Sequence, residues 1–372
     1  MFNVLTLNKI AKCGTDRLGD NYNVSDQCDA PDAVLVRSAS MHEMEMPESL
    51  LAIARAGAGV NNIPIKDCAD KGIVVFNSPG ANANAVKELV IAGLLMSSRK
   101  IVSGIEWAKT LKGNGDQVGK MVEKGKSNFA GPEITGKTLG VIGLGAIGIK
   151  VANAASALGM SVIGCDPYLS DDNKAKLNDC TIVESNDDVY KVADYITVHV
   201  PLNDGTRGMI NSDTIGKMKE GVRILNYSRD GLVVSADILS ALNSGKMSAY
   251  VTDFATDDIL GEEGVIAMPH LGASTPESED NCAIMAADEV KDYLENGNIV
   301  NSVNLPCVSK DKTGGTRVCV IAKADVNVED VKKATGSDDC AVGTRGDYCY
   351  MIIDNATSSQ VDVEGVIRVR TV

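Results

Sequence analysis

The fold is decided by the stretch TLGVIGLGAIG, residues 138–148. A short apolar run leads into glycines in G-x-G-x-x-G spacing, and a helical pattern begins directly after them. In this context the glycines permit a tight turn and a close approach of the backbone to a ligand. The start of the helix offers N–H groups and a favourable dipole to a pyrophosphate. The stretch therefore predicts a dinucleotide-binding turn made of Gly143, Gly145, Ala146, Ile147 and Gly148.

The next apolar run ends in Asp166, close to the spacing of about 20 residues expected for an acidic residue that binds the adenosine ribose. Its carboxylate would accept hydrogen bonds from the two ribose hydroxyls and repel a 2′-phosphate. This position favours NAD over NADP. The alternative is that Asp166 only begins the turn formed with Pro167 and Tyr168.

Short apolar runs alternate with helical segments on both sides of this stretch, a pattern typical of parallel sheets covered by helices. The predicted fold class is α/β, with two doubly wound parallel-sheet domains and a small α+β module at residues 306–372. The predicted helices before residue 138 are 47–57 and one long helix over 84–111. The predicted strands are 4–7, 33–38, 72–80, 138–145, 161–166, 194–200, 222–228, 249–254 and 264–270.

Composition restricts the class of partner. A hydrophobic fraction of 44% is that of a globular protein, and a net charge of −14 argues against nucleic acid or an anionic membrane as a partner. The ten cysteines include no C-x-x-C pair, which makes a disulfide framework or a metal site unexpected. No leader and no membrane-spanning run is evident, so a cytoplasmic location is expected.

Reactive side chains follow the later apolar runs, and ligands of open α/β sheets bind beyond the carboxyl ends of the strands. Arg229 could hold a substrate carboxylate through bidentate hydrogen bonds. His270 could exchange a proton with a substrate hydroxyl, because a histidine ordinarily titrates near neutral pH. The alternative is a core histidine and a surface arginine. His199 is expected to line the cofactor pocket, and His42 to lie in a surface loop.

Several blocks occur in the order found in one family. They are ARAGAGVNNI (54–63), NSPGANANAVKELVIAGLL (77–95), KTLGVIGLGAIG (137–148), HVPLNDGTRGMI (199–210), NYSRDGLV (226–233) and PHLGAST (269–275). With these blocks, residues 3–305 resemble the D-isomer-specific 2-hydroxyacid dehydrogenases. The resemblance implies a flavodoxin-like substrate domain (1–91), a Rossmann NAD domain (92–278), and a helix returning to the substrate domain (279–305). It also implies a homodimer or homotetramer that assembles through residues 90–130.

The resemblance further implies roles for individual residues. Arg229 and His270 correspond to the catalytic arginine and histidine. The acidic partner of His270 would be Asp257, or Asp258 under a different match of the preceding residues. Asp253 would contact the nicotinamide amide, and the other expected cofactor contacts are His199, Val200, Pro201, Thr206, Tyr227, Ser228 and Gly272. The expected substrate contacts are Arg37, Ser38, Arg55, Ala58 and Gly59, with the two arginines on a phosphate.

The activity implied is NAD-dependent oxidation of 3-phosphoglycerate to 3-phosphohydroxypyruvate, the first step of L-serine biosynthesis. Two alternatives remain at this point. One is a dehydrogenase acting on another 2-hydroxy acid, such as glyoxylate or a phosphorylated sugar acid. The other is a dinucleotide-sensing corepressor, which would bind the cofactor without a metabolic role.

The segment GVIRVRTV (365–372) resembles the closing strand of an ACT regulatory domain. The preceding segment IAKADVNVEDVKKA (321–334) lacks the Asn-x-Pro-Gly turn of the serine-binding version. Binding of serine and a role in assembly are both open for this ACT-like module.

Overall fold

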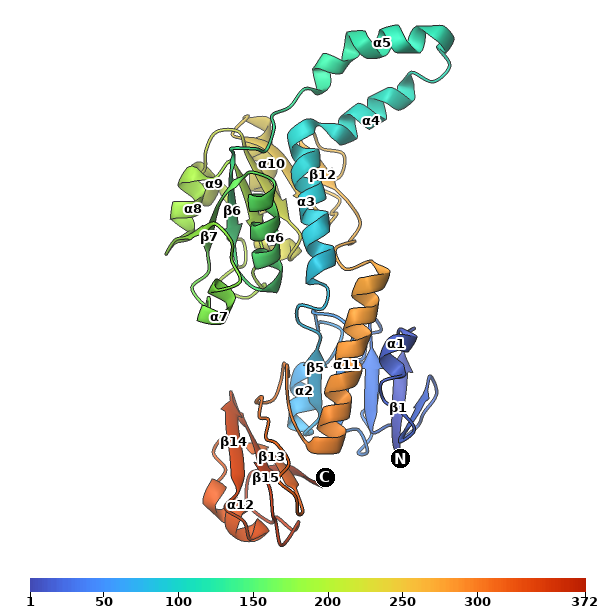
Figure 1. The fold of residues 1–372 in the computed structure, drawn as a ribbon, viewed down its shortest axis with the longest axis vertical. Coiled ribbons are helices and arrows are strands. Elements are labelled where there is room, and N and C mark those ends of the chain that lie inside the picture. The colour runs from blue at the N-terminus through green and yellow to red at the C-terminus, as the bar shows by residue number, and fades with distance from the viewer. The chain divides into compact units, whose positions relative to one another are not determined.

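Three sheets organise the chain in a computed structural model that describes residues 1–372 (Figure 1). Two of them are parallel and the third is antiparallel, which confirms the predicted fold class. The chain divides into two units. Unit 1 contains Met1–Asn82 and Thr275–Val372, and unit 2 contains Ala83–Ser274.

Unit 2 is built on a seven-stranded parallel sheet in the order β12-β11-β10-β9-β6-β7-β8. Its strands are β6 (Thr138–Ile142), β7 (Ser161–Cys165), β8 (Cys180–Ile182), β9 (Tyr195–Val198), β10 (Val222–Asn226), β11 (Met247–Thr252) and β12 (Val265–Ala267). Its helices are α3 (Ala83–Arg99), α4 (Ile101–Thr110), α5 (Val118–Gly125), α6 (Ala146–Ala157), α7 (Asp171–Lys174), α8 (Asn186–Val192), α9 (Ser212–Gly216) and α10 (Ser235–Asn243), with 3-10 helices η1 (Gly115–Gln117), η2 (Lys126–Phe129) and η3 (Asp230–Leu232).

Unit 1 combines the remaining two sheets. The parallel sheet has the order β2-β1-β3-β4-β5, formed by β1 (Phe2–Leu7), β2 (Tyr22–Ser25), β3 (Ala33–Val36), β4 (Ala52–Arg55) and β5 (Val74–Asn77). The antiparallel sheet has the order β14-β15-β13-β16, formed by β13 (Val318–Lys323), β14 (Cys340–Arg345), β15 (Tyr348–Ile353) and β16 (Val366–Thr371). The helices are α1 (Lys12–Thr15), α2 (Ile65–Asp70), α11 (Pro276–Asn296) and α12 (Val328–Thr335).

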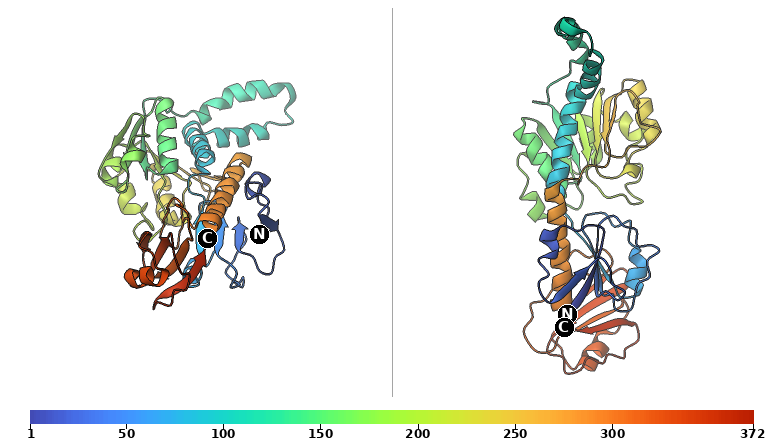
Figure 2. Two further views of the ribbon diagram at one scale, coloured as in Figure 1. Left: turned by 60° about the horizontal axis from the view of Figure 1, so that its bottom comes forward. Right: turned by 90° about the vertical axis from the view of Figure 1, so that its right-hand side faces the viewer.

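Two predicted helices were wrong. Residues 52–55, inside the predicted helix 47–57, form strand β4, whose first three residues are fully buried between β3 and β5. A short, continuously apolar run fits a buried strand and a buried helix equally well. The predicted helix 84–111 is two helices, because Lys100 adopts a left-handed conformation (φ 49°) between α3 and α4. In Figures 1 and 2, α4 and α5 project from the seven-stranded sheet as a hairpin.

Unit 1 depends on helix α11, which covers the parallel sheet and contacts β4 and β5. Val290, Tyr293 and Leu294 of this helix share one apolar core with strands of both sheets of unit 1. The helix begins after Thr275, whose hydroxyl accepts a hydrogen bond from Ser278 N, and ends at Gly297 in the left-handed conformation. The predicted returning helix is therefore present.

The last turn of α11 contains no basic residue of its own. Two arginines of the ACT-like module satisfy its terminal carbonyls instead. Arg370 Nη2 donates to the carbonyls of Tyr293 and Leu294 at 2.9 Å each, and Arg317 Nη1 donates to Asn296 O at 2.7 Å. Cations at a helix C terminus also stabilise its dipole. The module thus completes α11, and it belongs to unit 1 rather than standing apart.

The division between the units differs from the expected domain boundaries. The first crossing falls at 82/83 rather than 91/92, because α3 starts at Ala83 and packs as a whole on α6 and the seven-stranded sheet. The second falls at 274/275, directly before α11. No helix combines the length and the hydrophobicity that crossing a bilayer requires. All ten cysteines are free, and no group of side chains suited to a metal ion is present.

Candidate active site

The glycine turn of unit 2 lies where β6 passes into α6. Gly143 has a φ of +93°, and a Cβ there would lie 2.6 Å from His199 O. A Cβ on Gly148 would lie 2.0 Å from Gly143 O. Around Gly145, by contrast, the position of a Cβ is open. Two of the glycines are therefore required by packing, and the third leaves free space at the start of α6, beside Ala146 and Ile147, as a bound pyrophosphate requires.

Asp166 lies against this turn. Its Oδ2 accepts a hydrogen bond from Leu144 N at 2.8 Å, and its Oδ1 accepts one from Tyr168 N at 2.9 Å. The carboxylate thus begins a turn and at the same time faces the glycine loop. The two interpretations offered by the sequence are compatible with each other.

Three neighbouring strands end in buried polar atoms that have no hydrogen-bond partner. They are His199 Nδ1 after β9, the Tyr227 hydroxyl after β10, and Asp253 Oδ1 after β11. Such groups are rare in proteins, and each indicates a missing partner. Because β9, β10 and β11 are adjacent, the three residues follow strands at the same carboxyl edge of the sheet. The Tyr227 hydroxyl is turned against Gly93 of α3, so His199 and Asp253 are the two groups to which a polar cofactor at this edge would supply partners. This edge fits a dinucleotide.

His199 is held neutral. Its Nε2 lies 3.0 Å from Thr197 Oγ1, and burial lowers the pKa of His199 to about 4. A ring that stays unprotonated at neutral pH suits a pocket wall better than proton transfer. The loops around it are fixed by side-chain hydroxyls: Ser228 Oγ donates to Val200 O at 2.7 Å, and Thr206 Oγ1 donates to Pro201 O at 2.6 Å.

Asp253, His270 and Arg229 form an electrostatic group at the ends of β10, β11 and β12. Burial raises the pKa of Asp253, while the charges of His270 and Arg229 act to lower it. Asp253 Oδ2 accepts a hydrogen bond from Gly272 N at 3.1 Å, which ties the loop carrying His270 to the end of β11. The exposed imidazole packs on Phe254 with ring centroids 4.9 Å apart. The structure therefore brings together an acid, an imidazole and a guanidinium.

The carboxylate on which the charges of His270 and Arg229 act is Asp253, whereas Asp257, or Asp258, is the expected partner of His270. Asp257 is exposed and makes no side-chain hydrogen bond or ion pair, and Asp258 accepts a hydrogen bond from Thr256. Neither aspartate forms a side-chain hydrogen bond or an ion pair with His270 in this structure. Asp253, which directly ends β11, is close enough for its charge to act on the histidine.

Arg37 and Arg55 lie side by side in unit 1, at the ends of β3 and β4. Arg55 pairs in register with Val36, directly before Arg37, and Arg55 Nε donates to Arg37 O at 3.1 Å. Arg37 Nη2 also forms an ion pair with Glu279 Oε1 at 2.6 Å. The sequence analysis did not identify Glu279 as a partner of Arg37. The one signal in the sequence is that Glu279 is an acidic residue in the first turn of α11.

The other expected substrate contacts lie in the loops after the same two strands. Ser38 N donates to Asn8 Oδ1 at 2.9 Å, and Ala58 O accepts from Asn77 Nδ2 at 2.7 Å. Gly59 is half-buried. His42 is exposed and lies 2.9 Å from Asn61 O through Nε2, in a loop as predicted.

Comparisons with known proteins bear on both units. Residues 91–272 match the family model of the D-isomer specific 2-hydroxyacid dehydrogenase, NAD binding domain, which confirms NAD as the cofactor. The chain is 34% identical to D-3-phosphoglycerate dehydrogenase of Bacillus subtilis over 84% of its length and 61% of that protein. It is 35% identical to that of Methanocaldococcus jannaschii, over 76% of this chain and 53% of the other. The chain thus spans between half and two thirds of the length of these relatives.

Two solved structures share the fold over most of the length of this chain. The crystal structure of a glyoxylate reductase from Paecilomyes thermophila matches with a TM-score of 0.68 at 22% identity, covering 81% of this chain and 98% of that one. The NAD-bound 3-phosphoglycerate dehydrogenase of Entamoeba histolytica matches with a TM-score of 0.62 at 24% identity, covering 82% and 98%. At these identities the likeness shows the fold alone.

Proposed function

Since this chain belongs to the D-isomer-specific 2-hydroxyacid dehydrogenase family, we propose that it catalyses the NAD-dependent oxidation of 3-phosphoglycerate to 3-phosphohydroxypyruvate. The observation that carries the proposal is the electrostatic group of Arg229, Asp253 and His270 at the carboxyl edge of the seven-stranded sheet. The 2-hydroxy acid would be held by its carboxylate. It would lose the proton of its hydroxyl group and, as hydride, the hydrogen on the carbon that bears this hydroxyl. NAD, when bound, accepts that hydride.

Each residue of the group has a separate task in this proposal. Arg229 binds the substrate carboxylate through its guanidinium N–H groups, one of which now donates to Ser228 O at 2.6 Å. His270 Nε2 or Nδ1 takes the hydroxyl proton, as a general base. The imidazolium so formed is stabilised by the nearby Asp253 carboxylate. We retain Asp257 as the alternative partner, which would require the loop after Phe254 to rearrange.

The proposed phosphate site is Arg37 with Arg55. Arg37 uses one N–H of its five on Glu279, so donors remain for a phosphate. Each charge-assisted hydrogen bond contributes on the order of 1.5–3 kcal/mol, equivalent to roughly 10- to 150-fold in binding. A substrate without phosphate cannot use these donors, which is why they favour 3-phosphoglycerate over glyoxylate or a simple hydroxy acid.

The proposal is tested by the appearance of NADH with a panel of hydroxy acids. His270→Ala should lower kcat by roughly 10²–10⁴-fold while NAD still binds. The matched control is His42→Ala, an exposed histidine that should leave turnover unchanged. Activity of His270→Ala within tenfold of the wild type would refute proton transfer by this residue. NAD binding without turnover of any substrate would favour the corepressor alternative.

A second experiment tests which substrate the protein prefers. Arg37→Met and Arg55→Met should raise KM for 3-phosphoglycerate and leave KM for D-glycerate nearly unchanged. Arg17→Met serves as control, because Arg17 also pairs with an acid of α11, Asp288. Equal effects on both substrates would contradict the phosphate assignment without touching the catalytic one.

A further inference from the structure

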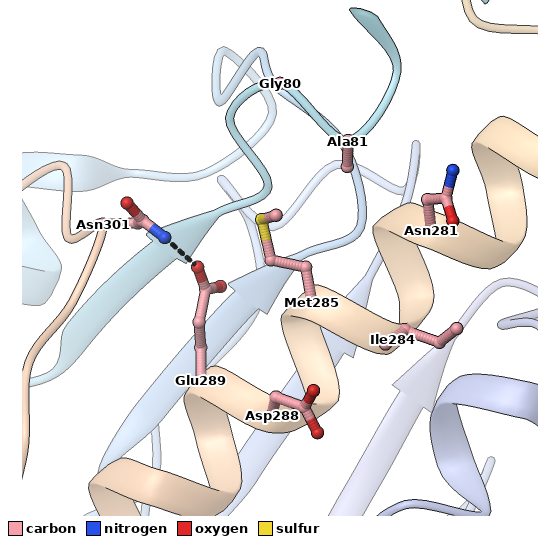
Figure 3. A pocket seen from close by; sticks show the side chains of 8 residues that line it. All are labelled: Gly80, Ala81, Asn281, Ile284, Met285, Asp288, Glu289 and Asn301. Carbon is pink, nitrogen blue, oxygen red and sulfur yellow. Dashed lines mark hydrogen bonds between the residues drawn. The ribbon is translucent and has the colours of Figure 1, made fainter. Parts of the chain in front are cut away.

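Unit 1 contains a pocket that none of the proposed catalytic steps uses. It lies between the loop at Gly80 and Ala81 and one face of α11, and has a volume of about 420 Å³ (Figure 3). Ligand pockets of small molecules usually measure about 300–1,000 Å³. Ala81, Ile284 and Met285 give it an apolar wall. The pocket therefore has the size and the apolar lining to accept a small organic molecule.

Glu289 carries an unmet carboxyl oxygen into this pocket. The residue is only 8% exposed, its Oε1 accepts a hydrogen bond from Asn301 Nδ2 at 2.8 Å, and its Oε2 has no partner. Figure 3 shows the carboxyl group beside Met285, on the side of α11 that faces the loop. Buried polar atoms in proteins are almost always hydrogen-bonded, so Oε2 lacks a partner that this chain does not supply.

The charges of the lining select the sign of a ligand. Two carboxyl groups, those of Asp288 and Glu289, contribute to the lining, and no lysine, arginine or histidine does. Asp288 is already paired with Arg17, whose Nε lies 2.5 Å from its Oδ1. Glu289 is the group left without a cation. An anionic ligand would be repelled by these acids, and only a cation would stabilise the carboxylate form of Glu289.

We propose that this pocket is a binding site for a small protonated primary amine. The ammonium group donates to Glu289 Oε2, and a short alkyl chain lies along Met285 and Ile284. A bare metal cation fits less well, because the structure places no group of three or more acidic, cysteine or histidine side chains together as ligands for a metal ion. This site goes beyond the proposed dehydrogenase reaction and does not depend on it.

Binding of an ammonium ion changes the ionisation of the site. Burial raises the pKa of Glu289 to about 8, so the carboxyl is mostly protonated at pH 7. A cation at Oε2 favours the carboxylate. The carboxylic acid then loses its proton to the buffer while the ammonium keeps all three of its own, and close to one proton is released for each amine bound.

The experiment is calorimetric titration of the full chain with n-butylammonium at pH 7, in phosphate and in MOPS buffer. The apparent enthalpies in the two buffers report the protons released. We expect saturable binding with release of nearly one proton. Glu289→Gln should weaken binding at least about tenfold, as loss of a charge-assisted hydrogen bond implies, and abolish proton release. Glu277→Gln, an exposed acid on the same helix, should change neither.

Three results would overturn the proposal: no saturable binding at tens of millimolar amine, equal binding of n-butanol, or displacement of the amine by equimolar potassium. The proton release of the wild type needs no variant, so the proposal stays testable if Glu289→Gln folds poorly. Met285→Trp, which fills the pocket and keeps the carboxyl group, should also weaken binding.

Discussion

Replacing Glu289 by glutamine should make unit 1 more stable, and increasingly so as the pH rises. The carboxyl group is buried with one oxygen unpartnered, and burial raises its pKa from the ordinary 4.5 to about 8. Glutamine has nearly the same shape, can still accept the hydrogen bond from Asn301, and cannot ionise. The substitution therefore removes the ionisation penalty and leaves the packing almost unchanged.

The sign follows from where the proton is bound. Below pH 4.5 the carboxyl of Glu289 is protonated in both the folded and the unfolded chain, and no penalty applies. Between pH 4.5 and 8 the folded chain keeps a proton that the unfolded chain has lost, so the stability of the wild type falls as the pH rises. The penalty amounts to about 1 kcal/mol at pH 5, about 3 kcal/mol at pH 7 and about 5 kcal/mol at pH 9.

Urea unfolding of the wild type and Glu289→Gln at pH 5, 7 and 9 measures this effect. The difference between the two free energies of unfolding should grow by roughly 3–4 kcal/mol over this range. Glu277→Gln, exposed on the same helix, should show a small difference that does not change with pH. A difference for Glu289→Gln that stays constant from pH 5 to 9 would refute the reasoning, because it would mean that the carboxyl is ionised at little cost.

Three further substitutions have defined outcomes. Arg317→Met leaves the buried Asp354 with Lys310 as its one remaining cation, and should lower the free energy of unfolding in urea by about 3 kcal/mol, the lower end for a broken buried pair. Lys333→Met, in an exposed pair of the same module, should lower it by less than about 1 kcal/mol. Equal effects of the two substitutions would contradict this. Asp166→Ala should raise kcat/KM with NADP relative to NAD, and unchanged discrimination would remove its proposed role. Lys100→Gly should raise the thermal midpoint, because the left-handed backbone there costs a lysine about 1 kcal/mol; a lower midpoint would count against this strain.

Most of the central strands could be predicted from the sequence, and three of the six edge strands could not. The strands that were missed besides β4 are β2, β8 and β14, and each lies at the edge of its sheet. An edge strand buries less of its surface, so it lacks the continuous apolar run that marks a central strand: Thr181 and Ile182 in β8 are both exposed. The missing information is tertiary, since these segments become strands only by pairing with a neighbour.

For the candidate site, too, the sequence lacks the tertiary information that decides some of the contacts. That Arg229 and His270 lie near each other could be predicted, because each lies three residues past the end of a strand, and strand ends meet at one edge of a parallel sheet. The acidic partner of His270 stays a prediction, because three aspartates, Asp253, Asp257 and Asp258, follow β11 and sequence spacing does not choose between them. Glu279, which pairs with Arg37 from a helix that is distant in the sequence, could not be inferred from spacing at all.

The division of unit 1 into two separated segments has a consequence for synthesis of the chain. Strands β1 to β5 leave the ribosome early, but the helix that completes their core lies beyond the whole of unit 2. At about 5–20 residues per second, the roughly 190 intervening residues take about 10–40 s to translate. During this interval the nascent sheet exposes the apolar surface that Val290, Tyr293 and Leu294 later cover, so chaperones have access to this sheet for as long as unit 2 is being translated.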